Sequence, residues 1–284
     1  MRRAVLTLLL LGSLATTPPR AQEPASDLPA FEVASIKPRT GERAFGGPSA
    51  PDRFVNADTT LRGLIRFAYD VQDFQIDGGP DWVDEARFDV SATAAGQPTR
   101  DEMRQMVRRL LAERFGLRTH VETREMPIYA LVMARADRAL GAQMRPATFD
   151  CGALLDKGAG ALPPRGPGEP APRCAWRIGL NAAVSRMFLD GASVPRFAAL
   201  IQPMLRRIII DRTGLTGTFD IELEFATDQI ELPLPLPPDA PAGTPRDGLS
   251  LFTAVEEQLG LKLESERGPV DVIVIDAARM PDPD

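Results

Sequence analysis

A stretch rich in glycine and proline, at residues 156–173, divides the chain and most constrains how the rest can fold. Its prolines lack amide donors and its glycines lose much conformational entropy on ordering, so neither a helix nor a strand is expected within it. Strand-like and helix-like patterns occur on both sides of it. We therefore predict an N-terminal lobe at 31–135, a linker at 136–174 and a C-terminal lobe at 175–278.

The N-terminal lobe is predicted to combine strands with helices. Alternation of apolar and polar residues indicates strands at 31–36, 87–93, 117–123 and 128–134. Thr59 or Thr60 can cap a helix. The apolar stripe of that helix consists of Leu61, Leu64, Ile65 and Ala68. Thr99 and Glu102 form a capping box for a second helix, which Gly116 is expected to end.

The second half of the chain repeats this order of elements. Its expected strands are 175–180, 218–225, 261–266 and 270–275, and its expected helices begin at Ser193 and about Leu249. FGLR at 115–118 corresponds to LGLK at 259–262, and FDV at 88–90 corresponds to FDI at 219–221. We therefore predict an α+β fold of two similar β-α-β-α-β-β lobes, an internal duplication. The alternative is chance similarity, because short amphipathic patterns recur easily.

The N-terminus has the pattern of a secretory signal peptide. Arg2 and Arg3 are followed by an almost wholly apolar run at 4–11 and by small residues. The run is too short to span a bilayer, and no later segment reaches spanning length without charges. We expect a signal peptide at 1–21, a flexible leader at 22–30, and a periplasmic or extracellular mature chain with no stable membrane span. An uncleaved membrane anchor is the alternative.

The chain contains only two cysteines, Cys151 and Cys174. In an oxidising compartment two such thiols are a natural pair, so a disulfide across the linker is expected. Closing a loop of this length stabilises a fold by about 3 kcal/mol in the chain-entropy model. Two unpaired buried thiols are the alternative.

Composition and motifs exclude several classes of protein. A net charge of −6 argues against a nucleic-acid binder, which needs a basic face. The single histidine, His120, lies in a predicted strand, and a Ser-His-Asp or Cys-His site would have to use it. The sequence contains no nucleophile elbow, P-loop or dinucleotide fingerprint, and its ligands for zinc are too few. We therefore assign no catalytic residue, no metal site and no cofactor.

A first candidate binding loop comprises Asp77, Gly78 and Gly79 together with Trp82. It lies in an acidic segment that contains Asp70, Asp73, Asp77, Asp81, Asp84 and Glu85. Oxygen ligands at this density could hold Ca²⁺, although their spacing does not match an EF-hand. We favour a Gly-Pro turn with solvated charges and with Trp82 packed underneath, because turns recruit Asp, Gly and Pro for backbone reasons.

A second candidate binding loop comprises Asp211, Arg212 and Gly214. Gly214 can adopt a positive φ, and Asp211 can accept hydrogen bonds from nearby amides, so a compact turn is the simpler interpretation. The arginine pairs at 108–109 and 206–207 are expected on solvated helix surfaces.

Five segments carry a resemblance to a known family. They are FEVASIKP (31–38), TLRGLIRFAYDVQDFQIDGGPDWVDEARFDVSA (60–92), LLAERFGLRTHVETREMPIYALV (110–132), DRTGLTGTFDIELEF (211–225) and LFTAVEEQLGLKLESERGPVDVIVID (251–276). In this order they closely resemble DUF3738, a family of soil-associated proteins expanded in Acidobacteria and of unknown function. Related domains follow the membrane-embedded peptidase module of BlaR1-type sensors. The resemblance thus implies an extracytoplasmic sensing or binding role, by association alone.

Two functions from different classes fit these observations. The first is a non-enzymatic, sensor-like module that binds a small ligand, a peptide or an envelope protein, with its site in the cleft between the lobes. The second is a carboxylate-dependent extracytoplasmic hydrolase, because paired acids can work without histidine. Two buried carboxylates in a deep cleft would favour the hydrolase. A sensor ectodomain without its membrane partner is a third possibility.

Overall fold

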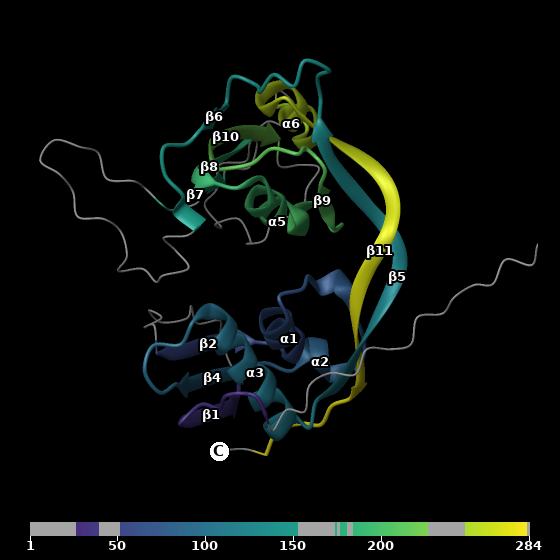
Figure 1. Cartoon of the computed structure of the whole chain (residues 1–284). Coiled ribbons are helices and arrows are strands. Elements are labelled where there is room, and N and C mark those ends of the chain that lie inside the picture. The colour runs from purple at the N-terminus through teal and green to yellow at the C-terminus, as the bar shows by residue number, and fades with distance from the viewer. Residues whose placement is uncertain are drawn as a thin grey trace, which may run out of the picture.

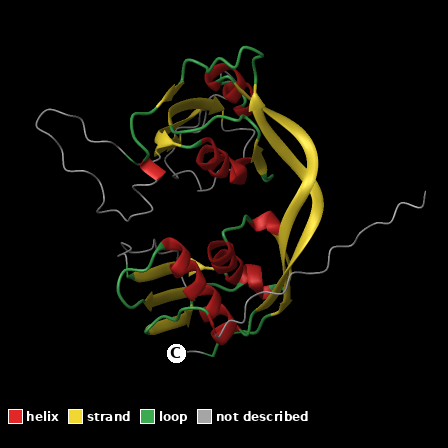
Figure 2. Cartoon of the chain, in the orientation of Figure 1, coloured by secondary structure: helices red, strands yellow, loops and turns green. Residues whose placement is uncertain are grey.

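The computed structural model of the protein describes residues 27–39, 52–152, 174, 177–180, 184–226 and 248–282. The predicted signal peptide, most of the predicted leader and the central part of the predicted linker lie outside the described residues. Two groups of helices and strands are connected by two long strands, β5 (Arg118–Met133) and β11 (Leu261–Ala277) (Figure 1). The α+β class predicted from the sequence is confirmed (Figure 2).

The first group, here called the N-terminal lobe, precedes β5 in the chain. Its elements are β1 (Val33–Pro38), β2 (Arg53–Thr59), α1 (Leu61–Tyr69), η2 (Asp73–Gln75), β3 (Ile76–Gly78), α2 (Trp82–Glu85), β4 (Phe88–Thr93) and α3 (Arg100–Phe115). The second group, the C-terminal lobe, lies between β5 and β11. Its elements are β6 (Met144–Pro146), β7 (Arg177–Leu180), β8 (Val184–Ala192), α5 (Val194–Leu205), β9 (Ile209–Asp211), β10 (Phe219–Ala226) and α6 (Leu251–Leu259).

The helices begin and end where their capping residues indicate. The Thr60 side chain accepts a hydrogen bond from the Gly63 amide at the start of α1, and the predicted capping box of Thr99 and Glu102 opens α3. The predicted apolar stripe of α1 is buried: Leu61, Leu64, Ile65 and Ala68. Gly116 ends α3 with a φ of 55°, in the left-handed region that glycine adopts at little cost. These predictions are confirmed because capping and periodicity are local properties.

Three sheets organise the strands. The N-terminal lobe contains the sheet β1-β4-β2, and the C-terminal lobe contains the sheet β6-β10-β8-β7. The third sheet, β3-β11-β5-β9, joins the lobes through the antiparallel pair of β5 and β11, which extends from the pairing of Leu261 with Met133 to that of Ala277 with Arg118.

The prediction of four short strands in the antiparallel pair of β5 and β11 was wrong. Residues 117–123 and 128–134 belong to one continuous strand, β5, and 261–266 and 270–275 belong to another, β11. Pro127 lies within the ladder opposite Arg267. Among the described strands, β5 has a single neighbour at that point, so a residue without an amide donor is tolerated.

Each lobe has its own apolar core, and the long strands contribute to both. The core of the N-terminal lobe includes Ile273 and Ile275 from the end of β11. The core of the C-terminal lobe includes Leu131 from the end of β5. Each half of the chain therefore completes the core of the other lobe. The domain boundaries at 135 and 175 stay a prediction.

The two outer strands of the sheet β3-β11-β5-β9 pair with their neighbours in the same way. β3 of the N-terminal lobe lies parallel to the end of β11, and β9 of the C-terminal lobe lies parallel to the end of β5. A duplicated chain that exchanged its last strands would produce this pattern. The internal duplication stays a prediction.

The predicted disulfide between Cys151 and Cys174 is confirmed. Their Cα atoms are 5.0 Å apart and both residues are buried. Within the described residues, no helix is both long and apolar enough to cross a membrane.

Candidate functional site: an arginine-rich pocket between the lobes

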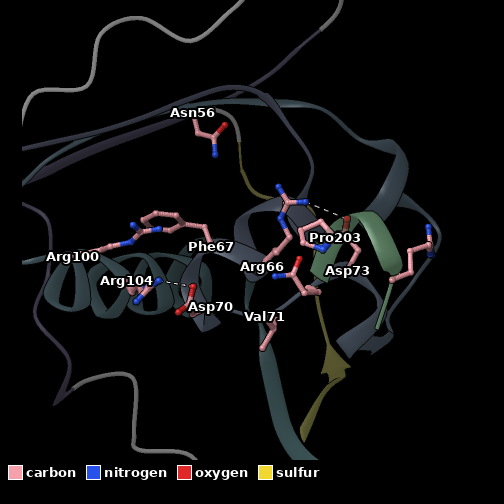
Figure 3. A pocket seen from close by; sticks show the side chains of 12 residues that line it. Asn56, Arg66, Phe67, Asp70, Val71, Asp73, Arg100, Arg104 and Pro203 are labelled. Carbon is pink, nitrogen blue, oxygen red and sulfur yellow. Dashed lines mark hydrogen bonds and ion pairs between the residues drawn. The ribbon is translucent and has the colours of Figure 1, made fainter. Parts of the chain in front are cut away.

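A pocket with a cavity volume of about 560 Å³ lies where the two lobes face each other (Figure 3). Most of its lining comes from β2, α1, η2, α3 and the turn after α1, all in the N-terminal lobe. The C-terminal lobe contributes Pro203 and Arg206 from the end of α5. The complete lining consists of Asn56, Gly63, Arg66, Phe67, Asp70, Val71, Gln72, Asp73, Arg100, Arg104, Pro203 and Arg206.

The ends of two helices bring these residues together. The last turn of α1 carries Arg66, and the helix ends at Asp70, which adopts a left-handed φ of 54°. α5 ends in the same conformation at Arg206, with a φ of 49°. Cations near a helix C-terminus interact favourably with the helix dipole, so both ends can carry arginine at little cost.

Arginine dominates the charge of the pocket. The lining contains four arginines and two aspartates, 4 − 2, an excess of two positive charges. The Arg66 guanidinium lies 3.2 Å from the Asp73 carboxylate. The Arg104 guanidinium lies 2.5 Å from the Asp70 carboxylate and also contacts Asp101 outside the lining. Figure 3 shows the pairs Arg66–Asp73 and Arg104–Asp70 as dashed lines.

Part of the pocket lining is apolar. Phe67, Val71 and Pro203 contribute to the lining. The Phe67 ring packs against the ring of Phe54, with centroids 4.9 Å apart, and Phe54 belongs to the core of the N-terminal lobe. The core of the N-terminal lobe therefore supports the Phe67 ring. The pocket combines apolar and polar lining groups.

The first predicted loop lies in the N-terminal lobe at the end of β3. Asp77 accepts a 2.6 Å hydrogen bond from Arg124 in β5, and this contact lowers the pKa of its carboxyl group. Gly78 and Gly79 have φ values of 75° and 88°. The Trp82 ring stacks on Phe115, with centroids 6.5 Å apart. These contacts account for each residue of the loop within the fold.

The second predicted loop lies in the C-terminal lobe at the end of β9. The Asp211 carboxylate accepts hydrogen bonds from the amide and the hydroxyl of Thr213, at 2.8 and 2.7 Å. Arg212 forms an ion pair with Glu266 at 2.8 Å. Gly214 has a φ of 63°, as the predicted turn requires.

The structure does not bring these two loops together. β3 and β9 are at opposite edges of the connecting sheet, and neither loop lines the pocket. Binding by Asp77, Gly78, Gly79 and Trp82, or by Asp211, Arg212 and Gly214, stays a prediction. Among the residues that the structure describes, no group of three His, Cys, Asp or Glu side chains could hold a metal ion.

His120 lies between two carboxylates in the antiparallel pair of β5 and β11. Its Nδ1 atom is 2.8 Å from Asp276 of β11, and its Nε2 atom is 3.1 Å from Glu122 of β5. The hydrogen bond with Glu122, together with that of Asp276, raises the pKa of the imidazole. Glu122 also pairs with Arg124, so the ring belongs to a charged network across the sheet.

The pocket residues could not be found from local patterns. They come from β2, three helices and η2, spread between Asn56 and Arg206, and no short motif joins them. Arg206 is exposed, as expected for a solvated position, and it also lines the pocket. Arg207 and Arg108 were also expected to be solvated, but each lies over a tyrosine ring, that of Tyr129 and Tyr69 respectively.

The fold and the site define an α+β protein with a disulfide and a polar pocket between two lobes. The chain belongs to the DUF3738 family of proteins of unknown function, whose model matches residues 62–278. No curated protein matches the chain, and no solved structure matches it.

Proposed function

We propose that this protein is an exported, non-enzymatic binding module that holds a small ligand between its two lobes. The observation that carries this proposal is the pocket, because residues from both lobes line it. Its volume of about 560 Å³ is in the range typical of small-molecule sites, and is small for a protein partner. A sensor-like role follows if the ligand changes how the lobes are held.

Two observations support export. The first is the N-terminal sequence, in which Arg2 and Arg3 precede an apolar run of signal-peptide length. The second is the disulfide between Cys151 and Cys174, because such bonds persist mainly in oxidising compartments. The proposed location is periplasmic or extracellular.

The alternative of a carboxylate-dependent hydrolase has less support. Such an enzyme needs one carboxyl group that stays protonated near neutral pH, usually through burial. No Asp or Glu residue in the described ranges is buried as a whole, although the Oδ2 atom of Asp190 is buried. The two aspartates of the pocket, Asp70 and Asp73, are more than half exposed, and each forms an ion pair with an arginine.

Release of the periplasmic contents of the producing cell, followed by native mass spectrometry, tests the proposal. The expected result is a cleaved, disulfide-bonded chain that carries an additional small mass. Asn56→Trp is expected to fill the pocket and to abolish that mass, because Asn56 lines the pocket from β2. Lys37→Trp, on an exposed position of β1 in the same sheet, is the matched control. An uncleaved, reduced chain in the cytoplasm would contradict export, and a bound mass unaffected by Asn56→Trp would contradict the site.

A further inference from the structure

Arg100 is the first observation that points to the class of ligand. It lines the pocket from the first residue of α3. Its guanidinium forms no hydrogen bond and no ion pair within the described part of the chain. Five N–H donors on a pocket wall are therefore available to a ligand.

Arg104 is the second observation. Its side chain is only 15% exposed, and two of its nitrogens contact Asp70 and Asp101. Its Nε atom is buried and has no hydrogen-bond partner among the described residues. Burying an unsatisfied donor of a charged group is costly, so one donor of Arg104 is left without a partner although its charge is paired with two carboxylates.

Arg206 is the third observation, because it belongs to the other lobe. It lines the same pocket from the end of α5, whereas Arg66, Arg100 and Arg104 belong to the N-terminal lobe. Like charges that line one pocket repel. An anion placed between them would reverse the sign of this interaction and attract both lobes.

Resting on the proposed function, we infer that the ligand is a small dianion, a phosphate or a dicarboxylate, bound by arginines of both lobes. The planar fork of arginine matches the geometry of carboxylate and phosphate oxygens. A dianion would complement a lining in which arginines outnumber aspartates. An organic part of the ligand would contact the apolar lining residues Phe67, Val71 or Pro203.

Calorimetric titration of the mature, disulfide-bonded protein tests the inference. The probes are inorganic phosphate and succinate, with glucose as an uncharged control, at constant ionic strength because salt screens charge interactions. Binding of at least one anion, and not of glucose, is expected. Arg100→Gln and Arg206→Gln are each expected to weaken that binding about tenfold, as for the loss of one charge-assisted hydrogen bond.

Two further variants separate charge from folding effects. Arg100→Lys keeps the charge but loses the fork, so we expect affinity between those of the wild type and Arg100→Gln. Arg186→Gln is the matched control, because Arg186 is an exposed arginine of β8 that pairs with Glu224 outside the pocket. It is expected to leave the affinity unchanged.

The outcomes distinguish this inference from the proposed function. If neither anion binds, but the native protein carries an uncharged molecule that Asn56→Trp removes, the dianion is wrong and the binding module stands. If the anions bind equally well to Arg100→Gln, Arg206→Gln and Arg186→Gln, the arginines do not hold them and the inference is overturned. If neither the anions nor any copurified molecule depends on the pocket, both fall.

Discussion

The Nδ1 atom of His120 in β5 lies 2.8 Å from a carboxylate oxygen of Asp276 in β11. This contact joins the two strands that connect the lobes. The end of β11 contributes Ile273 and Ile275 to the core of the N-terminal lobe. The pair of His120 and Asp276 therefore lies on the two strands that connect the lobes, and neither residue lines the pocket.

The His120 network predicts a dependence of stability on pH. The pKa of His120 is raised above its unfolded value of 6.5, chiefly by its hydrogen bond with Glu122. Its contribution to the free energy of unfolding is therefore complete below pH 6.5 and is lost as the pH rises through the folded-state pKa. Urea unfolding at pH values on both sides of 6.5 measures this loss. His120→Gln is expected to flatten the curve in this window, and parallel curves for the two proteins would contradict the prediction.

The turn after β3 predicts an effect of substituting Gly79. At this position φ is 88°, and a Cβ atom would lie 3.1 Å from Ile275 and 3.2 Å from Val83. Gly79→Ala should therefore destabilise the protein by more than the cost of about 1–2 kcal/mol for a left-handed non-glycine residue. Gly96→Ala is the matched control, because Gly96 has a φ of 71° and open space around it. Equal unfolding free energies for the two variants would show that packing at Gly79 does not matter.

Local signals in the sequence were sufficient for the helices α1, α3, α5 and α6, but not for the short helix α2, the long strands β5 and β11 or the pocket. The caps Thr60, Thr99 and Gly116 act within a few residues, so their effects can be read from the sequence. Pro127 looks like a strand break, yet it is tolerated because β5 has only one neighbour there among the described strands. Which lobe the end of each long strand enters is a tertiary property, which no local pattern contains.

The pocket could not be predicted either, because its lining residues are far apart in the sequence. Arg104 and Arg206 lie about a hundred positions apart, on helices of different lobes. No local pattern distinguishes either arginine as a site residue, so only the approach of the lobes makes them part of one pocket. The loops at Asp77 and Asp211 were predicted as binding loops because Gly and Asp are common in such loops. In the structure both loops are turns in which the aspartate accepts a hydrogen bond from a nearby amide.

The disulfide predicts a measurable loss of stability on reduction. Cys151 and Cys174 are separated by 23 positions, and the bond restricts the unfolded chain across that loop. Cys151→Ser together with Cys174→Ser should lower the free energy of unfolding by about 3 kcal/mol. Urea unfolding of the oxidised wild type, the reduced wild type and the double variant measures this. The prediction fails if the reduced wild type is as stable as the oxidised protein.

The packing of the end of β5 in the core of the C-terminal lobe predicts where a core mutation acts. Leu131 is fully buried and lies in the core of the C-terminal lobe, although it precedes the linker in the sequence. Leu131→Ala should destabilise the protein by about 2–5 kcal/mol through the cavity it leaves. Amide exchange should accelerate first in α5 and β10. Val33→Ala, at an exposed position, is the control. Faster exchange confined to the N-terminal lobe would contradict this core assignment.

Hydrogen–deuterium exchange with and without the anion that binds in calorimetry tests the central claim most directly. If a dianion bridges the lobes, exchange should slow together at 63–73 and 100–104 in the N-terminal lobe and at 204–206 in the C-terminal lobe. Arg100→Gln should remove the protection in both lobes. Protection in one lobe alone, or only around Asp77 or Asp211, would contradict a ligand held between the two lobes.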